Sequence, residues 1–264
     1  MQFHAVQHDV VPDDWQATRD AIAKQLDDAN LVEGDFVVLS EMTDTGWSMD
    51  LDNMTGIGTV KWACTLANTH NVWIQVGWAD RVDGRGKNCV TICSPEGDPV
   101  ATYTKVFTCN PFGENEHFDT GKELVVVDLG EIRVCPMICY DVRFPELWRP
   151  AAISGVDVFT VSSSWPHARI THWRAMLTSR AIENQAFVVA SNRVGKDTIT
   201  TWGGSSMIIT PQGDLLSESN ETDTQIISSE VDPEIARSWQ DEFPVLQDVQ
   251  EDLIGRIRVR RITA

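Results

Sequence analysis

The stretch Glu131-Ile-Arg-Val-Cys-Pro-Met-Ile-Cys-Tyr-Asp-Val-Arg-Phe-Pro-Glu-Leu-Trp-Arg149 indicates how the chain is built. A run of apolar and β-favouring residues reaches Cys139, the chain turns at Tyr140 and Asp141, and a helical pattern follows. A thiol is therefore expected at a strand-to-helix corner, where backbone N–H groups are free and a helix N-terminus is close. Such a corner is expected to lower the pKa of the thiol and to expose its sulfur, as a nucleophile requires. The alternative is a buried cysteine at the end of a core strand.

On either side of this stretch, strands alternate with helices in the same order in each half of the chain. The first half predicts a strand at 2–8, a helix with Trp15, Ile22, Leu26 and Ala29 on one face, a strand at 36–39, a helix with Val60, Ala63, Cys64 and Ala67 on one face, a strand at 72–77 and a hairpin at 89–103. The second half predicts a strand at 132–139, a helix from Phe144 to Ala152, a strand at 156–161, a helix from Trp173 to Ala181, a strand at 186–191 and a hairpin at 206–215.

Two halves of this order predict two mixed sheets packed face to face with helices outside. This is a four-layer α-β-β-α sandwich of the α/β class with an internal pseudo-two-fold repeat. One domain is expected over residues 1–235. Residues 236–264 form a tail that is expected to pack on the body or on a partner subunit, and it ends in a group of arginines at Arg256, Arg258, Arg260 and Arg261.

Composition excludes several classes of protein. The net charge of −18 and the absence of any run among the 21 basic residues argue against a nucleic-acid partner. No apolar run approaches the roughly 20 residues that span a bilayer, and the first eight residues do not have the pattern of a signal peptide, so a cytoplasmic protein is expected. The six cysteines are expected to be reduced thiols, and neither their spacing nor that of the histidines predicts a metal site.

Three reactive side chains follow predicted strands directly: Glu41, Lys105 and Cys139. Ligands of open α/β sheets bind beyond the carboxyl ends of strands, so these side chains are candidates for one site. A carboxylate can take the thiol proton, the thiolate can attack an acyl carbon, and the ammonium can hold charge on the tetrahedral oxygen. Taken singly, Glu41 could equally cap or pair near a strand end, and Lys105 could be a solvated loop lysine.

The surroundings of these three residues resemble a known family. Ser40-Glu-Met-Thr-Asp-Thr-Gly46, Tyr103-Thr-Lys-Val-Phe107 and Cys135-Pro-Met-Ile-Cys-Tyr-Asp-Val-Arg-Phe-Pro-Glu146 are similar to the three signature blocks of the nitrilase superfamily of carbon–nitrogen hydrolases. The resemblance extends from residue 2 to about residue 232. It implies a Glu41–Lys105–Cys139 triad in an α-β-β-α sandwich. The sequence has no Gly-rich phosphate loop and no set of metal ligands, so no cofactor is expected.

The same resemblance implies further site residues. The family has a second glutamate seven residues before a glycine, and Glu114 has that offset here, with Glu116 as its competitor. Its implied role is to orient Lys105 and the attacking water. The implied oxyanion donors are Lys105 and the backbone N–H of Tyr140. Arg180-Ala-Ile-Glu-Asn184 matches a block of the family that is read as a structural anchor.

Within the superfamily the chain resembles the omega-amidase-like branch, which hydrolyses the terminal amide of small 2-oxo dicarboxylic acid monoamides. The matching segments are Asp141–Glu146, Ser164–Arg169 with His172-Trp173, and Phe243–Asp248. Such a substrate carries a carboxylate and needs a local basic pocket, because the surface as a whole repels anions. Arg143 or Arg169 is expected to bind that carboxylate, and a structural salt bridge is the alternative for each.

Trp165 follows the strand at 156–161, which favours a place in the pocket wall over one between the sheets. The expected partners are therefore a small anionic amide and, because members of the superfamily are commonly oligomeric, a second copy of the chain. A nitrilase or another amide or carbamoyl hydrolase of the same superfamily is the alternative activity. A catalytically silent binding or scaffold protein is the alternative of a different class.

Overall fold

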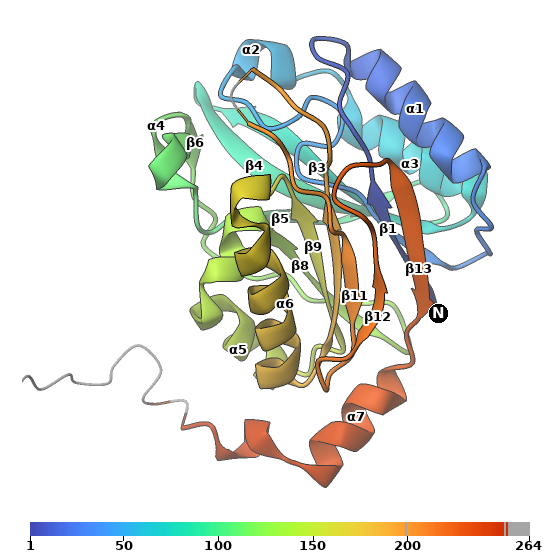
Figure 1. Ribbon diagram of the computed structural model, residues 1–264, viewed down its shortest axis with the longest axis vertical. Helices are drawn as coiled ribbons and strands as arrows, with labels where there is room; N and C mark the ends of the chain where they lie inside the picture. Colours follow the sequence, from blue (N-terminus) through green and yellow to red (C-terminus); the bar gives the residue numbers. More distant parts are fainter. Residues whose placement is uncertain (199, 251, 253–264) are drawn as a thin grey trace, which may run out of the picture.

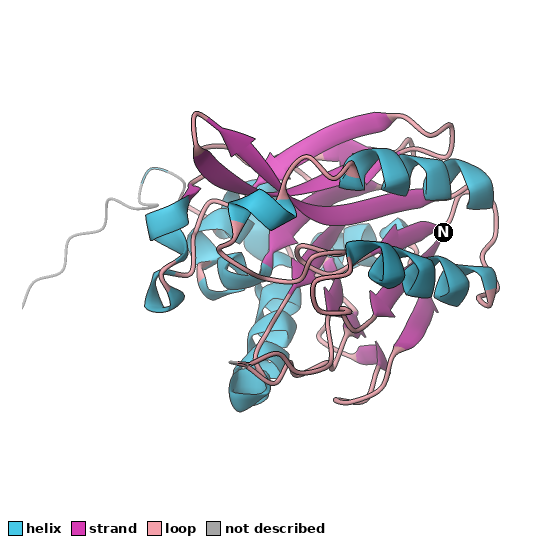
Figure 2. Cartoon of the chain, turned by 90° about the horizontal axis from the view of Figure 1, so that it is seen from above, coloured by secondary structure: helices cyan, strands magenta, loops and turns pink. Residues whose placement is uncertain are grey.

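The computed structural model describes residues 1–198, 200–250 and 252. Its strands form two mixed sheets that pack face to face, and helices α1 (Trp15–Asp27) and α3 (Thr59–His70) lie on one outer side (Figure 1). Helices α5 (Pro145–Ile153) and α6 (Ile170–Asn184) lie on the other, and the turned view shows the same elements from above (Figure 2). The predicted four-layer α-β-β-α sandwich is confirmed.

The first sheet contains seven strands. β1 (Gln2–Gln7), β2 (Phe36–Val38) and β3 (Trp73–Val82) are parallel neighbours, and β4 (Arg85–Cys93) and β5 (Pro99–Thr104) continue the sheet as antiparallel strands. The short β6 (Phe118–Asp119) pairs with β4, and β13 (Gln225–Glu230) closes the other edge beside β1.

The second sheet repeats this plan. β8 (Arg133–Ile138), β9 (Val158–Ser163) and β10 (Phe187–Asn192) are parallel, and β11 (Met207–Ile209) and β12 (Leu215–Glu218) follow as antiparallel strands. β7 (Val127–Asp128) lies antiparallel to β8, as β13 does to β1. The predicted internal repeat is therefore present, and it extends to these two edge strands, which the sequence pattern did not predict.

The remaining helical segments are short or lie near the end of the chain. They are α2 (Leu51–Met54), α4 (Glu114–His117), α7 (Pro233–Glu242) and the 3₁₀ turns Asn110–Phe112, Cys139–Arg143, His167–Arg169 and Val245–Asp248. Within the described ranges, none of the helices is long and apolar enough to cross a membrane.

Strand alternation divides the core into layers, because successive side chains point to opposite faces of a sheet. Between the sheets lie apolar side chains from both, among them Phe3, Phe36, Val38, Val134, Val158 and Phe187. Under α1 and α3 the neighbouring positions of the same strands pack with the helices, including Val6, Val37, Ile22, Leu26 and Ala63. Under α5 and α6 the corresponding cluster includes Met137, Val161, Trp148, Trp173 and Leu177. Both faces of each sheet are covered, which explains why the strands read as continuous apolar runs.

The segment after β13 packs on the body. Arg237 of α7 forms an ion pair with Asp157 at 3.1 Å, and the side chain of Gln185 donates to the backbone oxygen of Phe243 at 2.8 Å. The expected division of the chain at residue 235 stays a prediction, and α7 runs across it. The arginines of the expected tail, at 256–261, lie outside the described residues. The expected homo-oligomer stays a prediction.

Gly77 in β3 allows the loop after β2 to lie against the sheet. A Cβ atom at this position would lie 2.5 Å from the backbone oxygen of Ser40, 2.7 Å from the nitrogen of Met42 and 2.9 Å from the Cα of Glu41. All three atoms belong to backbone, so a side chain at residue 77 must displace the segment that carries Glu41.

We therefore expect Gly77→Ala to lower the free energy of unfolding by about 1–3 kcal/mol, the usual effect of overpacking. The variant should also lose any activity that depends on Glu41. Thermal unfolding and an activity assay measure the two effects. Gly84→Ala is the control, because a Cβ there meets no atom within 4 Å and only the left-handed φ of +83° opposes the change. A loss of activity in Gly84→Ala equal to that in Gly77→Ala would contradict the argument, because strain at residue 84 should lower stability without moving Glu41.

Candidate active site

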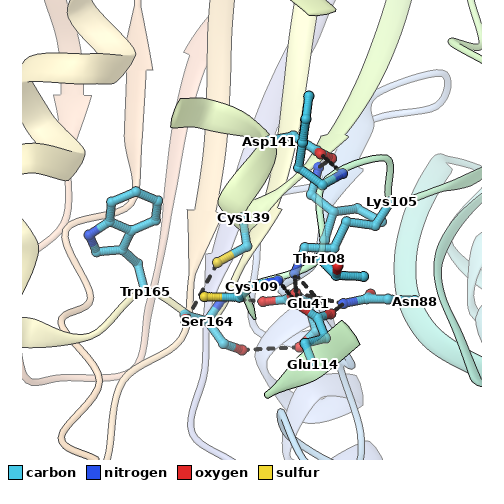
Figure 3. Close-up of polar contacts among 12 residues, drawn as sticks. Glu41, Asn88, Lys105, Thr108, Cys109, Glu114, Cys139, Asp141, Ser164 and Trp165 are labelled. Atoms are coloured by element: carbon cyan, nitrogen blue, oxygen red, sulfur yellow. Dashed lines mark hydrogen bonds and ion pairs between the residues drawn. The ribbon is translucent and has the colours of Figure 1, made fainter. Parts of the chain in front are cut away.

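Three strand ends bring the predicted reactive side chains together (Figure 3). Glu41 lies three residues after β2, Lys105 directly follows β5, and Cys139 directly follows β8. Glu41 and Lys105 have no exposed surface, and Cys139 is 8% exposed. Two strands of the first sheet and one of the second therefore supply a carboxylate, an ammonium and a thiol to one buried place.

Lys105 forms ion pairs with two carboxylates. Its Nζ lies 2.8 Å from Oε1 of Glu41 and 3.0 and 2.9 Å from the two carboxylate oxygens of Glu114. Glu116 is exposed, and its backbone oxygen accepts a hydrogen bond from Arg85. The structure thus places Glu114 at the lysine and Glu116 at the surface.

Burial and charge set the protonation of this group. Burial alone would lower the pKa of Lys105, but Glu114 and Glu41 outweigh it and hold that pKa well above its ordinary value. Burial raises the pKa of Glu41, the positive charge of Lys105 opposes the rise, and the negative charge of Glu114 adds to it. The ammonium is therefore permanent, while Glu41 is a carboxylate that can accept a proton.

Sequence reasoning missed the other donors to these carboxylates. The Asn88 amide donates to Oε1 of both Glu41 and Glu114, at 2.8 Å each. The backbone N–H of Ser164 donates to Oε2 of Glu41 at 3.1 Å, and that of Cys109 donates to Oε2 of Glu114 at 2.5 Å. The two backbone donors carry no signal in the sequence, whereas an asparagine within a buried strand is a signal that could have been noticed.

Cys139 occupies the turn that the sequence predicts. It begins a 3₁₀ turn after β8, and its φ of +40° places a non-glycine residue in the left-handed region. Such a conformation is sparsely populated and persists only where the surrounding contacts impose it. The thiol donates to the backbone oxygen of Ser164 at 3.7 Å. Ser164 therefore links the two groups, because its N–H binds Glu41 and its carbonyl binds Cys139.

The expectation that this corner lowers the pKa of the thiol and exposes it is wrong for the protein without substrate. Burial, with the negative charge of Glu41 next in size, raises the pKa of Cys139 well above its ordinary value, and the positive charge of Lys105 does not compensate. A 3₁₀ turn of five residues offers little of the helix N-terminus on which the expectation relied. This environment favours the neutral form of the Cys139 thiol.

Asp141 holds the turn in place. Its carboxylate accepts hydrogen bonds from the backbone N–H of Ile138 at 3.1 Å, the backbone N–H of Phe107 at 2.9 Å and the hydroxyl of Tyr103 at 2.8 Å. Burial raises the pKa of Asp141 to about 7, although its donors oppose the rise. One side chain thus connects the corner at Cys139 to the loop that follows Lys105.

A cavity of about 220 Å³ opens over the thiol. The predicted residues that line it, besides Lys105 and Cys139, are Tyr140, Arg143, Trp165 and Arg169. Its other walls, which sequence reasoning missed, include Trp47, Phe112 and Trp202, whose rings contact one another. The space is apolar with a few convergent polar groups, which is typical of a small-molecule site.

Both candidate arginines reach this cavity. The guanidinium carbon of Arg143 lies 4.5 Å from the ring centre of Trp165 and 5.8 Å from that of Tyr140. That of Arg169 lies 5.5 Å from the ring of Phe112. Within residues 1–198, 200–250 and 252 neither arginine forms an ion pair with a carboxylate. The structural salt bridge considered for each is not among their contacts, so both cations line the cavity without an acidic partner in the described part of the chain.

Trp165 lies in the wall of the cavity, as expected, and its ring also packs against α6. The side chain is 2% exposed, its ring packs 5.4 Å from that of Trp173, and its Nε1 donates to the backbone oxygen of Arg169 at 2.8 Å. The residue belongs to the core under α6 and also lines the cavity.

The structural anchor expected at residues 180–184 lies apart from the cavity. Arg180 pairs with Glu183 at 2.6 Å and donates to the backbone oxygen of Val142.

Comparisons with known proteins agree with this geometry. A family model described as carbon–nitrogen hydrolase matches residues 5–241. The chain is 32% identical over 224 residues to the 2-oxoglutaramate amidase of Bacillus subtilis, covering 83% of this chain and 86% of that protein. It is 31% identical over 220 residues to the omega-amidase YafV of Escherichia coli K12, covering 82% and 85%.

A solved structure gives the same result for the fold. XC1258 of Xanthomonas campestris, a CN-hydrolase superfamily protein with an arsenic adduct in its active site, superposes with a TM-score of 0.88 at 26% identity. The match covers 95% of this chain and 97% of that one.

The raised pKa of Cys139 leads to a prediction. Alkylation by iodoacetamide requires thiolate, so the rate at Cys139 should keep rising above about pH 10, where an ordinary thiol with a pKa of about 8.5 is almost fully ionised. Glu41→Gln removes a neighbouring negative charge and should move the midpoint to lower pH. Peptide mapping by mass spectrometry measures the rate at this cysteine, and the same cysteine in urea is the control. A midpoint at or below 8.5 in the folded protein would show that the thiol is activated at rest.

Proposed function

Because the chain belongs to the carbon–nitrogen hydrolase family, we propose that it hydrolyses the terminal amide of a small 2-oxo dicarboxylic acid monoamide to the acid and ammonia. The observation that carries the proposal is the cavity, which combines the thiol of Cys139 with two arginines that lack an acidic partner in the described chain. The names of the relatives, 2-oxoglutaramate amidase and omega-amidase, point to the same substrate class.

The first half of the reaction forms a thioester. Glu41 takes the proton of Cys139 while Sγ attacks the amide carbon, so the thiolate arises only as the new bond forms. The Lys105 ammonium and the backbone N–H of Tyr140 hold the developing oxyanion. Glu41 then gives its proton to the nitrogen, the C–N bond breaks and ammonia leaves. A neutral resting thiol suits this sequence, since proton transfer and attack are coupled through one carboxylate.

The second half hydrolyses the thioester. Water enters the place that ammonia left, Glu41 removes its proton, and the hydroxide attacks the acyl carbon. Collapse of the tetrahedral intermediate breaks the C–S bond, and Glu41 returns the proton to Sγ. Glu114 orients Lys105 and the water, a role supported by its two contacts with the lysine at 3.0 and 2.9 Å.

The substrate carboxylate is assigned to Arg143 and Arg169. The chain carries a net charge of −18, so an anionic substrate needs a cationic pocket within a repelling surface. Both guanidinium groups lie close to aromatic rings of the wall, and the planar fork of an arginine suits bidentate contact with a carboxylate. An aromatic wall around them excludes water and strengthens that contact.

The activity is tested by ammonia release from a panel of omega-amides, neutral amides and nitriles. We expect release from 2-oxo omega-amides, and Cys139→Ala should reduce it by several orders of magnitude because no thioester can form. Cys109→Ala is the matched control, since Cys109 also lines the cavity but contributes only its backbone N–H to Glu114. Hydrolysis of nitriles but of no amide would show that the protein is a nitrilase and not an amidase. Full activity in Cys139→Ala would contradict a mechanism through a Cys139 thioester.

The assignment of the carboxylate is tested by Arg143→Ala and Arg169→Ala. Loss of a charge-assisted contact of about 1.5–3 kcal/mol should raise KM for the anionic amide by about 10- to 100-fold, with a much smaller effect for a neutral amide of the same length. Arg174→Ala is the control, because Arg174 on α6 pairs with Glu218 and Glu221 and does not line the cavity. Equal changes of KM for the anionic and the neutral amide would show that the substituted arginine does not bind the substrate carboxylate.

A further inference from the structure

The site contains one more negative charge than Lys105 can neutralise. Glu41 and Glu114 are both fully buried, and both contact the same ammonium. Two buried carboxylates that share one cation repel each other, and one of them tends to take up a proton. A protonated Glu41 could not act as base, so something besides Lys105 must favour its ionised form.

Asn88 is placed to do this. The residue lies on β4, is 1% exposed, and sends its Nδ2 to Oε1 of Glu41 and to Oε1 of Glu114, at 2.8 Å each. An amide carries two N–H donors on this nitrogen, so each carboxylate receives one. Asn88 does not line the cavity.

The orientation of the amide follows from its surroundings. If Nδ2 and Oδ1 were exchanged, the amide oxygen would face two carboxylates, which is repulsive. In the orientation with both donors used, Oδ1 is buried and has no hydrogen-bond partner among the described residues. Such an unpaired acceptor destabilises the fold, and an apolar side chain of similar size would avoid the loss. The contribution of the amide therefore lies in its two donors.

We propose that Asn88 is a positioning residue for hydrolysis: its amide bridges Glu41 and Glu114, keeps Glu41 ionised, and fixes one carboxylate oxygen so that the other is left toward Cys139. The proposal rests on the role given above to Glu41 as base. Oε1 of Glu41 accepts from both Lys105 and Asn88. Among the described residues, Oε2 accepts only from the backbone N–H of Ser164, the residue whose carbonyl accepts the thiol of Cys139. Proton exchange with the thiol therefore belongs to Oε2.

The direction of the effect can be stated. A hydrogen bond from Asn88 to the charged form lowers the pKa of Glu41 and opposes the rise that burial and Glu114 cause. Removal of the donor should raise that pKa. Hydrogen bonds to charged groups are strong enough to move a pKa by about one to two units. Glu41 would then lose its proton only at higher pH.

The experiment is an NMR titration of protein labelled with ¹³C at the glutamate carboxyl carbon, with the Glu41 resonance assigned from Glu41→Gln. In Asn88→Leu, which has similar volume but no donor, the midpoint of Glu41 should move up by about one to two pH units. Asn88→Asp, which keeps the shape and loses the amide, should move it in the same direction. An unchanged midpoint in both variants would overturn the proposal, whether or not their stability falls.

Thr91→Val is the matched control. Thr91 lies on the same strand, is 1% exposed, and binds the side chains of Thr102 and Trp78 away from the site. Its loss should lower thermal stability as a buried polar change does, and the Glu41 midpoint should stay where it is in the parent protein. A shift of the same size in Thr91→Val would mean that loosening of β4, and not the amide, sets the titration, and would also overturn the proposal.

Turnover supplies the second readout. The pH profile of kcat/KM is measured for whichever amide the parent protein hydrolyses. In Asn88→Leu its acid limb should move to higher pH by the same amount as the Glu41 midpoint, so that kcat falls at pH values on that limb. KM should stay within about twofold of the parent value, because Asn88 does not line the cavity. A rise of KM without a shift of the acid limb would contradict the role. If no omega-amide is hydrolysed, the proposed substrate fails, while the NMR titration still decides the role of Asn88.

Discussion

The buried contact of the Lys105 ammonium with Glu41 and Glu114 is the interaction on which the rest of the site depends. Removal of one partner from a buried ion pair typically costs about 3–5 kcal/mol, because the other charge is left without compensation. The strands around the site therefore have to deliver all three charges together. Gly77 allows the Glu41 loop to approach, the end of β5 supplies Lys105, and α4 turns Glu114 inward. The Asn88 amide donates to carboxylate oxygens that the lysine also contacts, and the backbone N–H of Ser164 donates to Oε2 of Glu41, which the lysine does not contact.

The thiol is controlled differently. Cys139 has a φ of +40° and is held by the turn that Asp141 closes, so its position is fixed by the backbone. Burial and the charge of Glu41 raise the pKa of Cys139 and so favour the protonated form of its sulfur. An enzyme of this kind does not need a standing thiolate. It needs a base within reach and a cation that stabilises the oxyanion, and the same lysine that neutralises the carboxylates lies in the wall of the cavity.

Much of this could be predicted from the sequence, and the parts that could not share a physical reason. Apolar runs of strand length and amphipathic helices gave the repeat, because both faces of each sheet are buried. The strand at 225–230, Gln-Ile-Ile-Ser-Ser-Glu, was missed because it is a half-exposed edge strand with polar positions. Glu114 and Glu116 could not be separated by spacing alone, since a short helix decides which of the two points inward. Asn88 lies one residue before the predicted strand that begins at Cys89, and its partners come from residues 26 and 47 positions away.

The sequence by itself determined the fold class, the three strand ends that carry Glu41, Lys105 and Cys139, and the chemistry that such side chains can perform. These features are local: they depend on periodicity, on turn residues and on short blocks around each side chain. Only the tertiary structure decided the direction of the pKa shift of the thiol, the choice of Glu114, the bridge made by Asn88 and the two arginines that line the cavity without an acidic partner among the described residues. Each of these depends on burial and on the distance between charges from separate strands, and neither quantity exists until the two sheets have packed together.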